Sequence, residues 1–269
     1  MLHNTFNTAQ NRQTNVKILD KIDHKPTAQW APFSKEELKQ VIAKCNDSLA
    51  PGPDKLSWRH LKIIIKQDKC LINIINIANV CINLEHWPDY FKHSSTIIIP
   101  KPNKSLYDHV KIFHPIVFLN MLGKLIEKVI AERIQFTVMK NNFIHPCQLD
   151  RSKFKSTTDV GVALTHIVRS GWAKGKTTST LTFDISQFFP SLNHNLLTTT
   201  LSKAGLEPKV SKFFADYLVK RKTNYVWNNL QFPEFEVNVG VGQGSVLFSI
   251  LLALYLALFL HILEKCLKI

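Results

Sequence analysis

Residues 181–192 read LTFDISQFFPSL, an apolar, strand-forming run that places one carboxylate, Asp184, directly before a turn. A strand that ends in aspartate can offer its carboxylate to a divalent cation, since magnesium prefers oxygen ligands. The commoner arrangement is an aspartate that caps the turn or helix after a strand. Asp184 is therefore a candidate metal ligand whose assignment depends on the sequence around it.

A glycine-rich turn, GVGQGSVL at residues 240–247, comes later and leads into a long apolar segment. Glycine lets the backbone approach a bound molecule closely. A glycine-rich turn is weak evidence of a binding site by itself. The order GQGS directly before an apolar helix is a far more specific pattern.

The composition indicates a folded, basic protein. The chain has 269 residues, 45% hydrophobic content and a net charge of +14, with a pI near 9.6. Such a chain can bury a substantial core, which argues against disorder throughout. The charge favours nucleic acid as the first partner and an anionic membrane surface as the second. The plainer alternative is a soluble basic protein that binds neither.

The cysteines and the N-terminus point to an intracellular protein, in the nucleus or cytoplasm. Five cysteines at irregular spacing form no CxxC pair and no zinc-site pattern with histidine, so we expect reduced, mostly buried thiols. Residues 1–29 are polar and lack the apolar core of a secretory signal. We expect them to be a poorly ordered lead-in to one domain over residues 30–269.

Hydrophobic spacing and turn residues predict an α+β fold. Ser34 and Glu37 form a capping box that starts a helix ending near Asn46. Two prolines around a glycine make residues 48–56 a rigid loop. Further helices are predicted at 61–84, at 123–140 with charged residues on its outer face, at 156–168 and at 213–221. Strands are predicted at 95–100, 116–120 and 181–184, and residues 170–176 are predicted to be a linker. Helices dominate, and the strands cluster around Asp184.

Residues 246–263 carry no formal charge and reach the length of a membrane span. A helix buried in a large core is also apolar on all sides. We favour the buried helix, because the run begins at the glycine-rich turn, and keep the membrane span as the alternative.

Five segments in order resemble the motifs of a reverse transcriptase of the non-LTR (LINE-like) retrotransposon type. They are APGPD at 50–54, IIPKP at 98–102, FHPIVFLN at 113–120, the Asp184 stretch as motif A and the glycine-rich turn as motif B. Residues 213–221 resemble the FxxYLxxR helix between motifs A and B, so Asp216 is expected to be a solvated helix residue. The resemblance covers residues 30–269. It implies the fingers and a partial palm of a right-hand polymerase, with a small antiparallel sheet and no thumb.

The resemblance also implies a catalytic site for RNA-directed DNA polymerisation. Asp184 would ligate Mg²⁺ together with the backbone carbonyl of Ile185. Phe189 would lie under the sugar and exclude a 2′-hydroxyl by its size.

Three further residues would bind the incoming nucleotide by the same resemblance. Lys101 would meet the triphosphate as a point charge. Gln243 would contact the nucleotide, and Gly244 would let the turn pass close to it. The implied partners are an RNA template, a DNA primer and deoxynucleotides.

The chain departs from the family pattern at several positions. His114 stands where the family usually has arginine, which would clamp phosphates through two hydrogen bonds. After Gln148 the expected glycine is absent and Asp150 stands nearby, which puts a template contact in doubt. Residues 247–249 lack the proline that normally follows motif B. The sequence ends at Ile269 without the aspartate pair of motif C.

A single carboxylate leaves a two-metal site half built, and residues that act as a unit lose most activity together. We therefore expect an inactive reverse transcriptase fragment. The alternatives are a non-catalytic, basic nucleic-acid-binding remnant and a protein anchored in a membrane by residues 246–263. The motifs do not indicate an oligomeric state.

Overall fold

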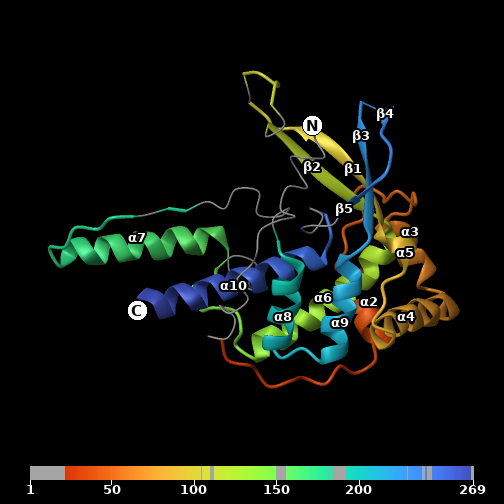
Figure 1. Cartoon of the computed structure of the whole chain (residues 1–269), viewed down its shortest axis with the longest axis horizontal. Helices are drawn as coiled ribbons and strands as arrows, with labels where there is room; N and C mark the ends of the chain where they lie inside the picture. Colours follow the sequence, from red (N-terminus) through yellow and green to blue (C-terminus); the bar gives the residue numbers. More distant parts are fainter. Residues whose placement is uncertain are drawn as a thin grey trace.

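The computed structural model describes residues 22–103, 105–109, 112–149, 156–180, 182–183, 192–228, 230–237, 240 and 244–267. Figure 1 shows most helices gathered into one body, a sheet projecting from it, and α7 lying apart. The helices are α2 (Lys35–Ala43), α3 (Trp58–Ile64), α4 (Asp68–Asn83), α5 (Asp89–Lys92), α6 (Met121–Lys140), α7 (Thr157–Ala173), α8 (His194–Lys203), α9 (Pro208–Leu218) and α10 (Leu247–Leu267). The strands are β1 (His93–Pro100), β2 (Phe113–Leu119), β3 (Arg221–Trp227), β4 (Leu230–Gln231) and β5 (Phe235–Val237). The predicted α+β class is confirmed.

The sheet is mixed, so the expectation of an antiparallel sheet is wrong. Its order is β2-β1-β3-β4, with β5 also paired to β3. β1 and β2 are antiparallel, whereas β1 and β3 run parallel from His93 opposite Lys222 to Ile97 opposite Val226. Parallel strands need a long crossover. Here the chain returns to β1 only after passing through α6, α7, α8 and α9.

The hydrophobic core surrounds α6. Helices α2, α3 and α10 pack against α6, and α8 packs against both α9 and α10. Ile126, Ile130 and Ile134 of α6 are fully buried. Their four-residue spacing keeps them on one face of the helix.

Two predicted helices have different limits in the structure. The predicted helix at 61–84 is two helices, because the chain turns after α3 and Gln67 adopts an extended conformation before α4. The apolar spacing continues across this turn, so periodicity could not reveal it. Helix α7 runs through most of the predicted linker. It begins with a capping box between Ser156 and Asp159 and ends before Gly175, whose φ of +67° is typical of a helix C-terminus.

Three other boundaries moved by a few residues. The first predicted helix ends at Ala43 rather than near Asn46. Strand β2 begins at Phe113, before the predicted start, because Pro115 lies in a strand that pairs on one side only, with β1. Asn120 is the residue that precedes α6 rather than the end of the strand.

Part of the predicted lead-in contacts the helical body. Lys203 donates a hydrogen bond from Nζ to the carbonyl of Ile22 at 2.8 Å. The Ala28 amide donates to the carbonyl of Gly205 at 2.8 Å. Residues 22–28 therefore run along the turn between α8 and α9.

Helix α10 is buried along its first half and more exposed along its second. Leu247, Leu251 and Leu254 are fully buried, whereas Phe259 is 50% exposed. Within the described part of the chain, α10 is the one helix long and apolar enough to cross a membrane, over residues 247–264. Its first half is a core helix in this fold.

Candidate active site

The glycine-rich turn lies against strand β2. Gly244 has a φ of +146°, a conformation that other residues rarely adopt. A Cβ atom at this position would collide with the carbonyl oxygen of Val117 in β2. Glycine is therefore required here both by the backbone angle and by the close approach of two backbones.

A buried carboxylate holds the other side of this turn. Glu127 of α6 is 1% exposed and accepts hydrogen bonds from the Ser245 hydroxyl at 2.9 Å and from the Val246 amide at 3.1 Å. The Tyr217 hydroxyl of α9 donates to the same carboxylate at 2.7 Å. A negative charge beside the first amides of a helix is favourable. Glu127 thus joins α6, α9 and the start of α10.

The Tyr217 phenol stays protonated in this environment. Burial, and then the neighbouring Glu127 carboxylate, raise the pKa of Tyr217 well above its usual value. The phenol therefore remains a hydrogen-bond donor to Glu127 throughout the physiological pH range.

The beginning of the turn is hydrogen-bonded to the end of the Asp184 stretch. The Gly240 amide donates to the carbonyl of Leu192 at 3.3 Å. His194 lies with Nε2 2.8 Å from the Gly240 carbonyl, which can only accept, so Nε2 carries the proton. Burial lowers the pKa of His194, and the Arg221 charge lowers it further, against the opposing effect of the Gly240 carbonyl. His194 is thus a neutral donor near pH 7.

The APGPD loop fixes the join between β2 and α6. Asp54 accepts the Met121 amide at 2.8 Å through one carboxylate oxygen and the Leu56 amide at 3.2 Å through the other. An added Cβ on Gly52 would lie 2.5 Å from the carbonyl oxygen of Leu119. The loop therefore caps the first turn of α6 and orients the helix that carries Glu127.

A comparison with known protein families matches residues 99–269 to the family described as "Reverse transcriptase (RNA-dependent DNA polymerase)". This match covers well over half of the chain. The chain belongs to the reverse transcriptase family.

Similar proteins are encoded by non-LTR retrotransposons. The chain is 25% identical over 226 residues to "RNA-directed DNA polymerase from mobile element jockey" of Drosophila funebris, a match that covers 84% of this chain and 24% of the relative. It is 26% identical over 225 residues to "Probable RNA-directed DNA polymerase from transposon X-element" of Drosophila melanogaster, over 83% of this chain and 24% of the relative. A type-1 retrotransposable element R2 polyprotein of Popillia japonica matches at 22% identity over 219 residues, covering 81% of this chain and 29% of the relative. The chain thus spans about a quarter of the length of these relatives.

Helix α9 and the residues after it, between the Asp184 stretch and the glycine-rich turn, supply core residues and a buried arginine. Phe214, Tyr217 and Leu218 are fully buried. The Arg221 guanidinium lies 4.7 Å from the centre of the Tyr217 ring and donates to the Tyr217 carbonyl at 3.2 Å. The FxxYLxxR pattern therefore joins α9 to the start of β3.

The expectation that Asp216 is a solvated residue is wrong. Its carboxylate accepts hydrogen bonds from the Trp87 amide at 2.7 Å and from Lys92 Nζ at 3.1 Å, and it lies 3.0 Å from His86 Nδ1. Burial raises the pKa of Asp216, but the Trp87 and Lys92 hydrogen bonds outweigh this effect and leave the pKa below its usual value. The Lys92 side chain is only 2% exposed, so the pair is a structural link between α9 and the chain after α4.

Most of the predicted catalytic residues lie outside the described residues: Asp184, Ile185, Phe189 and Gln243. Of the predicted strand before Asp184, Thr182 and Phe183 are described, and neither is in a strand. Phe183 is 84% exposed. A strand forms where its backbone groups find a partner, and no described strand pairs with these two residues.

Lys101, His114 and Gln148, which the sequence analysis also singled out, lie in the part of the chain that is described. Lys101 follows β1 at the turn of the β1–β2 hairpin, where its amide donates to the Ile112 carbonyl at 2.8 Å. His114 is exposed on β2. Gln148 is buried and donates to the Ala253 carbonyl of α10 at 3.0 Å. This contact assigns Gln148 a structural role within the chain.

Sequence reasoning missed Glu127 and His194. Glu127 was expected on a charged outer face of its helix, but it lies on the buried side. The spacing of Gly123, Glu127, Ile130 and Ile134 at four, three and four residues placed it in the apolar stripe. That spacing was the available signal, whereas nothing local marks His194.

The burial of four of the five cysteines is described, and all four are free thiols. Cys45 and Cys81 are buried, Cys70 is partly buried and Cys147 is exposed. Burial raises the pKa of the Cys81 thiol to about 11. Cys81 is therefore a protonated core residue at neutral pH.

Proposed function

We propose that this chain forms the fingers and part of the palm of a non-LTR RNA-directed DNA polymerase. The observation that carries the proposal is the position of the glycine-rich turn. The amide at one end donates a hydrogen bond to the carbonyl of Leu192, the last residue of the Asp184 stretch, and the other end lies against β2 of the hairpin that carries Lys101. The glycine-rich turn thus lies between the end of the Asp184 stretch and the hairpin that carries Lys101.

In this proposal Asp184 and the Ile185 carbonyl are ligands of Mg²⁺, to which a carboxylate and a carbonyl oxygen are suited. The metal would supply charge to the triphosphate and activate the primer hydroxyl. Lys101 binds the triphosphate, and Phe189 rejects a ribose. RNA template, DNA primer and deoxynucleotides are the proposed partners, because the family copies RNA into DNA.

Gln243 and Gly244 contact the incoming nucleotide in this proposal. Glu127 and His194 are positioning residues for them. They hold the two ends of the turn through the Val246 amide and the Gly240 carbonyl.

We further propose that the 269-residue chain does not extend a primer by itself. Glu264 is the one acidic residue after the glycine-rich turn, and it lies near the end of α10. Catalysis by two metal ions needs more than the single carboxylate of Asp184. A primer-extension assay with an RNA template, Mg²⁺ and deoxynucleotides should give no product. Template-dependent product that disappears in Asp184→Ala would contradict this proposal and identify Asp184 as catalytic.

Nucleotide binding tests the site without requiring turnover. A photoreactive deoxynucleoside triphosphate should label the chain in Mg²⁺. Asp184→Ala and Lys101→Ala should each lower the labelling several-fold, whereas Asp89→Ala, whose side chain is 80% exposed, is the matched surface control. Equal labelling of all four proteins would reject the site.

Single-stranded RNA should bind weakly and with little sequence preference, because the net charge is +14. The logarithm of the affinity should fall linearly with the logarithm of salt concentration, by about 0.7 per phosphate contact. Lys101→Ala should weaken binding slightly. A flat salt dependence, or no binding at low salt, would contradict the proposal.

A membrane anchor is the second candidate, and the length and apolar character of α10 favour it. The burial of the first half of α10 favours the core helix instead. After expression in cells, we expect an insoluble pellet that urea dissolves, because exposed apolar surface promotes aggregation. Recovery in membranes that resist carbonate washing and release the chain only in detergent would establish the anchor.

A further inference from the structure

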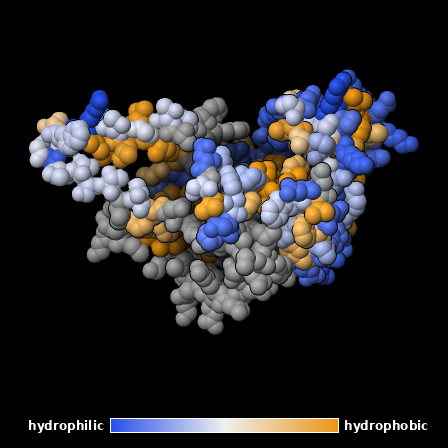
Figure 2. All heavy atoms as spheres, turned by 90° about the horizontal axis from the view of Figure 1, so that it is seen from above, coloured by the Kyte–Doolittle hydropathy of each residue, from blue (hydrophilic) through white to orange (hydrophobic). Residues whose placement is uncertain are grey.

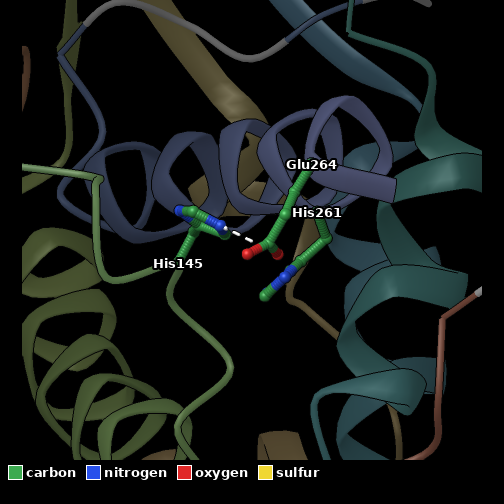
Figure 3. Close-up of side chains that lie close together, drawn as sticks. All are labelled: His145, His261 and Glu264. Carbon is green, nitrogen blue, oxygen red and sulfur yellow. Dashed lines mark hydrogen bonds and ion pairs between the residues drawn. The ribbon is translucent and has the colours of Figure 1, made fainter. Parts of the chain in front are cut away.

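Three side chains that can ligate a metal ion converge where the last turns of α10 pass the loop after α6 (Figure 3). His145 belongs to the loop, while His261 and Glu264 lie three residues apart on α10 and so share a face of the helix. One ligand atom from each lies within 4.8 Å of the other two. His145 Nε2 and Glu264 Oε2 are 3.2 Å apart. Ligand atoms around tetrahedral zinc are separated by about 3.3 Å, given bonds of about 2.0–2.2 Å.

The ring of His261 is oriented as in metal sites. Its Nε2 lies 2.9 Å from the Phe143 carbonyl, so Nε2 carries the proton and Nδ1 keeps its lone pair. Metal-binding histidines usually donate their second N–H to a carbonyl or a carboxylate in this way.

The ring of His145 is held by the loop. The Cys147 amide donates to its Nδ1 at 3.2 Å, so the neutral ring carries its proton on Nε2 and donates it to Glu264. If a metal ion binds Nε2, the proton moves to Nδ1, and the hydrogen bond from the Cys147 amide to Nδ1 is lost. The ring is already aimed at the carboxylate, so binding needs only a small adjustment of the loop.

Burial and ligand type favour zinc. The His145 side chain is 8% exposed and the Glu264 side chain 51% exposed. The buried His145 ring therefore faces a carboxylate that is open to solvent. Two imidazoles and one carboxylate suit zinc, whereas magnesium takes oxygen ligands. We propose that His145, His261 and Glu264 bind a zinc ion that fastens the second half of α10 to the loop after α6. This site is independent of the proposed polymerase function.

The test uses the full chain after removal of metal with a chelator. Zinc is titrated in competition with a chromophoric chelator, and thermal unfolding is followed by circular dichroism. One zinc ion per chain should bind and raise the unfolding temperature, because a ligand of the native state alone stabilises it. Magnesium at the same concentration should leave the unfolding temperature unchanged. Absence of zinc binding by a chain with a folded spectrum would overturn the proposal.

Variants distinguish zinc binding at this site from non-specific zinc binding by surface histidines. His261→Ala and Glu264→Gln should each weaken zinc binding more than about tenfold. Glu264→Gln changes a half-exposed side chain of the same shape, so the fold should be retained. His166→Ala, on the exposed surface of α7, is the matched control and should bind zinc like the unaltered chain. Unchanged zinc affinity in His261→Ala and Glu264→Gln would refute the site.

Discussion

Helices α10 and α7 are both rich in apolar residues, yet only α10 finds cover. The first half of α10 packs against α6 and α8, and Glu127 accepts a hydrogen bond from the Val246 amide, directly before the helix. Helix α7 makes few contacts with the other described elements and exposes apolar residues along its length (Figure 2, the arm at the left). These residues include Val160, Val162, Leu164, Ile167 and Trp172. Apolar character alone therefore does not decide burial, which depends on a complementary surface and on satisfied polar groups at the helix end.

Removal of a core side chain from α10 should have the largest effect. Leu251 is fully buried, so Leu251→Ala should lower the free energy of unfolding by about 2–5 kcal/mol through lost burial and a residual cavity. The matched change on α7 is Leu164→Ala, where the side chain is 46% exposed and the expected loss is below about 1 kcal/mol. Urea unfolding measures both values. Equal losses would mean that α7 is covered in solution.

The second-largest loss of stability should come from breaking the hydrogen bonds between Glu127 and the residues directly before α10. Glu127→Gln replaces one accepting oxygen with an amide donor that faces the Ser245 and Val246 donors, so the expected loss is about 1–3 kcal/mol. Glu132→Gln on the same helix changes a carboxylate that is 39% exposed and should cost less than about 1 kcal/mol. Unfolding in urea compares the pair. A negligible loss in Glu127→Gln would show that packing alone holds α10.

Acidification should weaken the join between His194 and the glycine-rich turn ahead of α10. The folded pKa of His194 lies below its reference value of 6.5, so the unfolded chain binds more protons between the two values. Stability should therefore fall as pH drops below about 6.5. Asp216 and Glu37 also have lowered pKa values, but they titrate in the more acidic range of carboxylates.

The variant His194→Gln isolates this contribution, because its side-chain amide can still donate to Gly240 but does not titrate. Thermal unfolding between pH 7 and pH 5 should depend less on pH in the variant. An unchanged pH dependence would exclude His194 as its source.

A charged substitution on α7 should have the smallest effect on stability. Ile167 is 62% exposed, so Ile167→Lys should change the free energy of unfolding by less than about 0.5 kcal/mol. It should raise solubility, because it interrupts an exposed apolar surface. Light scattering and urea unfolding check the two effects. Marked destabilisation would indicate that this face of α7 is packed in solution.

Local chemistry in the sequence accounts for much of this fold. The capping box at Ser34 and Glu37 forms as predicted, and apolar spacing located α6 and α10. The predicted helix at 213–221 matches only the second half of α9 and extends to Arg221, the first residue of β3. The motifs identified the family, since their residue order and spacing can be read without coordinates. Roles for Asp184, Ile185, Phe189, Lys101, Gln243 and Gly244 remain predictions from that resemblance.

Only the tertiary structure decided which charged residues pair over long distances and which strands run parallel. The chain pairs β1 with β3 through a long crossover, and it brings Asp216 to Lys92 across more than one hundred residues. Likewise, the fold brings His145 next to Glu264, a pair too far apart in the sequence for any local pattern to indicate it. Helix caps and apolar periods depend on neighbours within a few residues, so a sequence determines them directly. Long-range pairs depend on how separate surfaces fit, and that fit is a property of the folded chain.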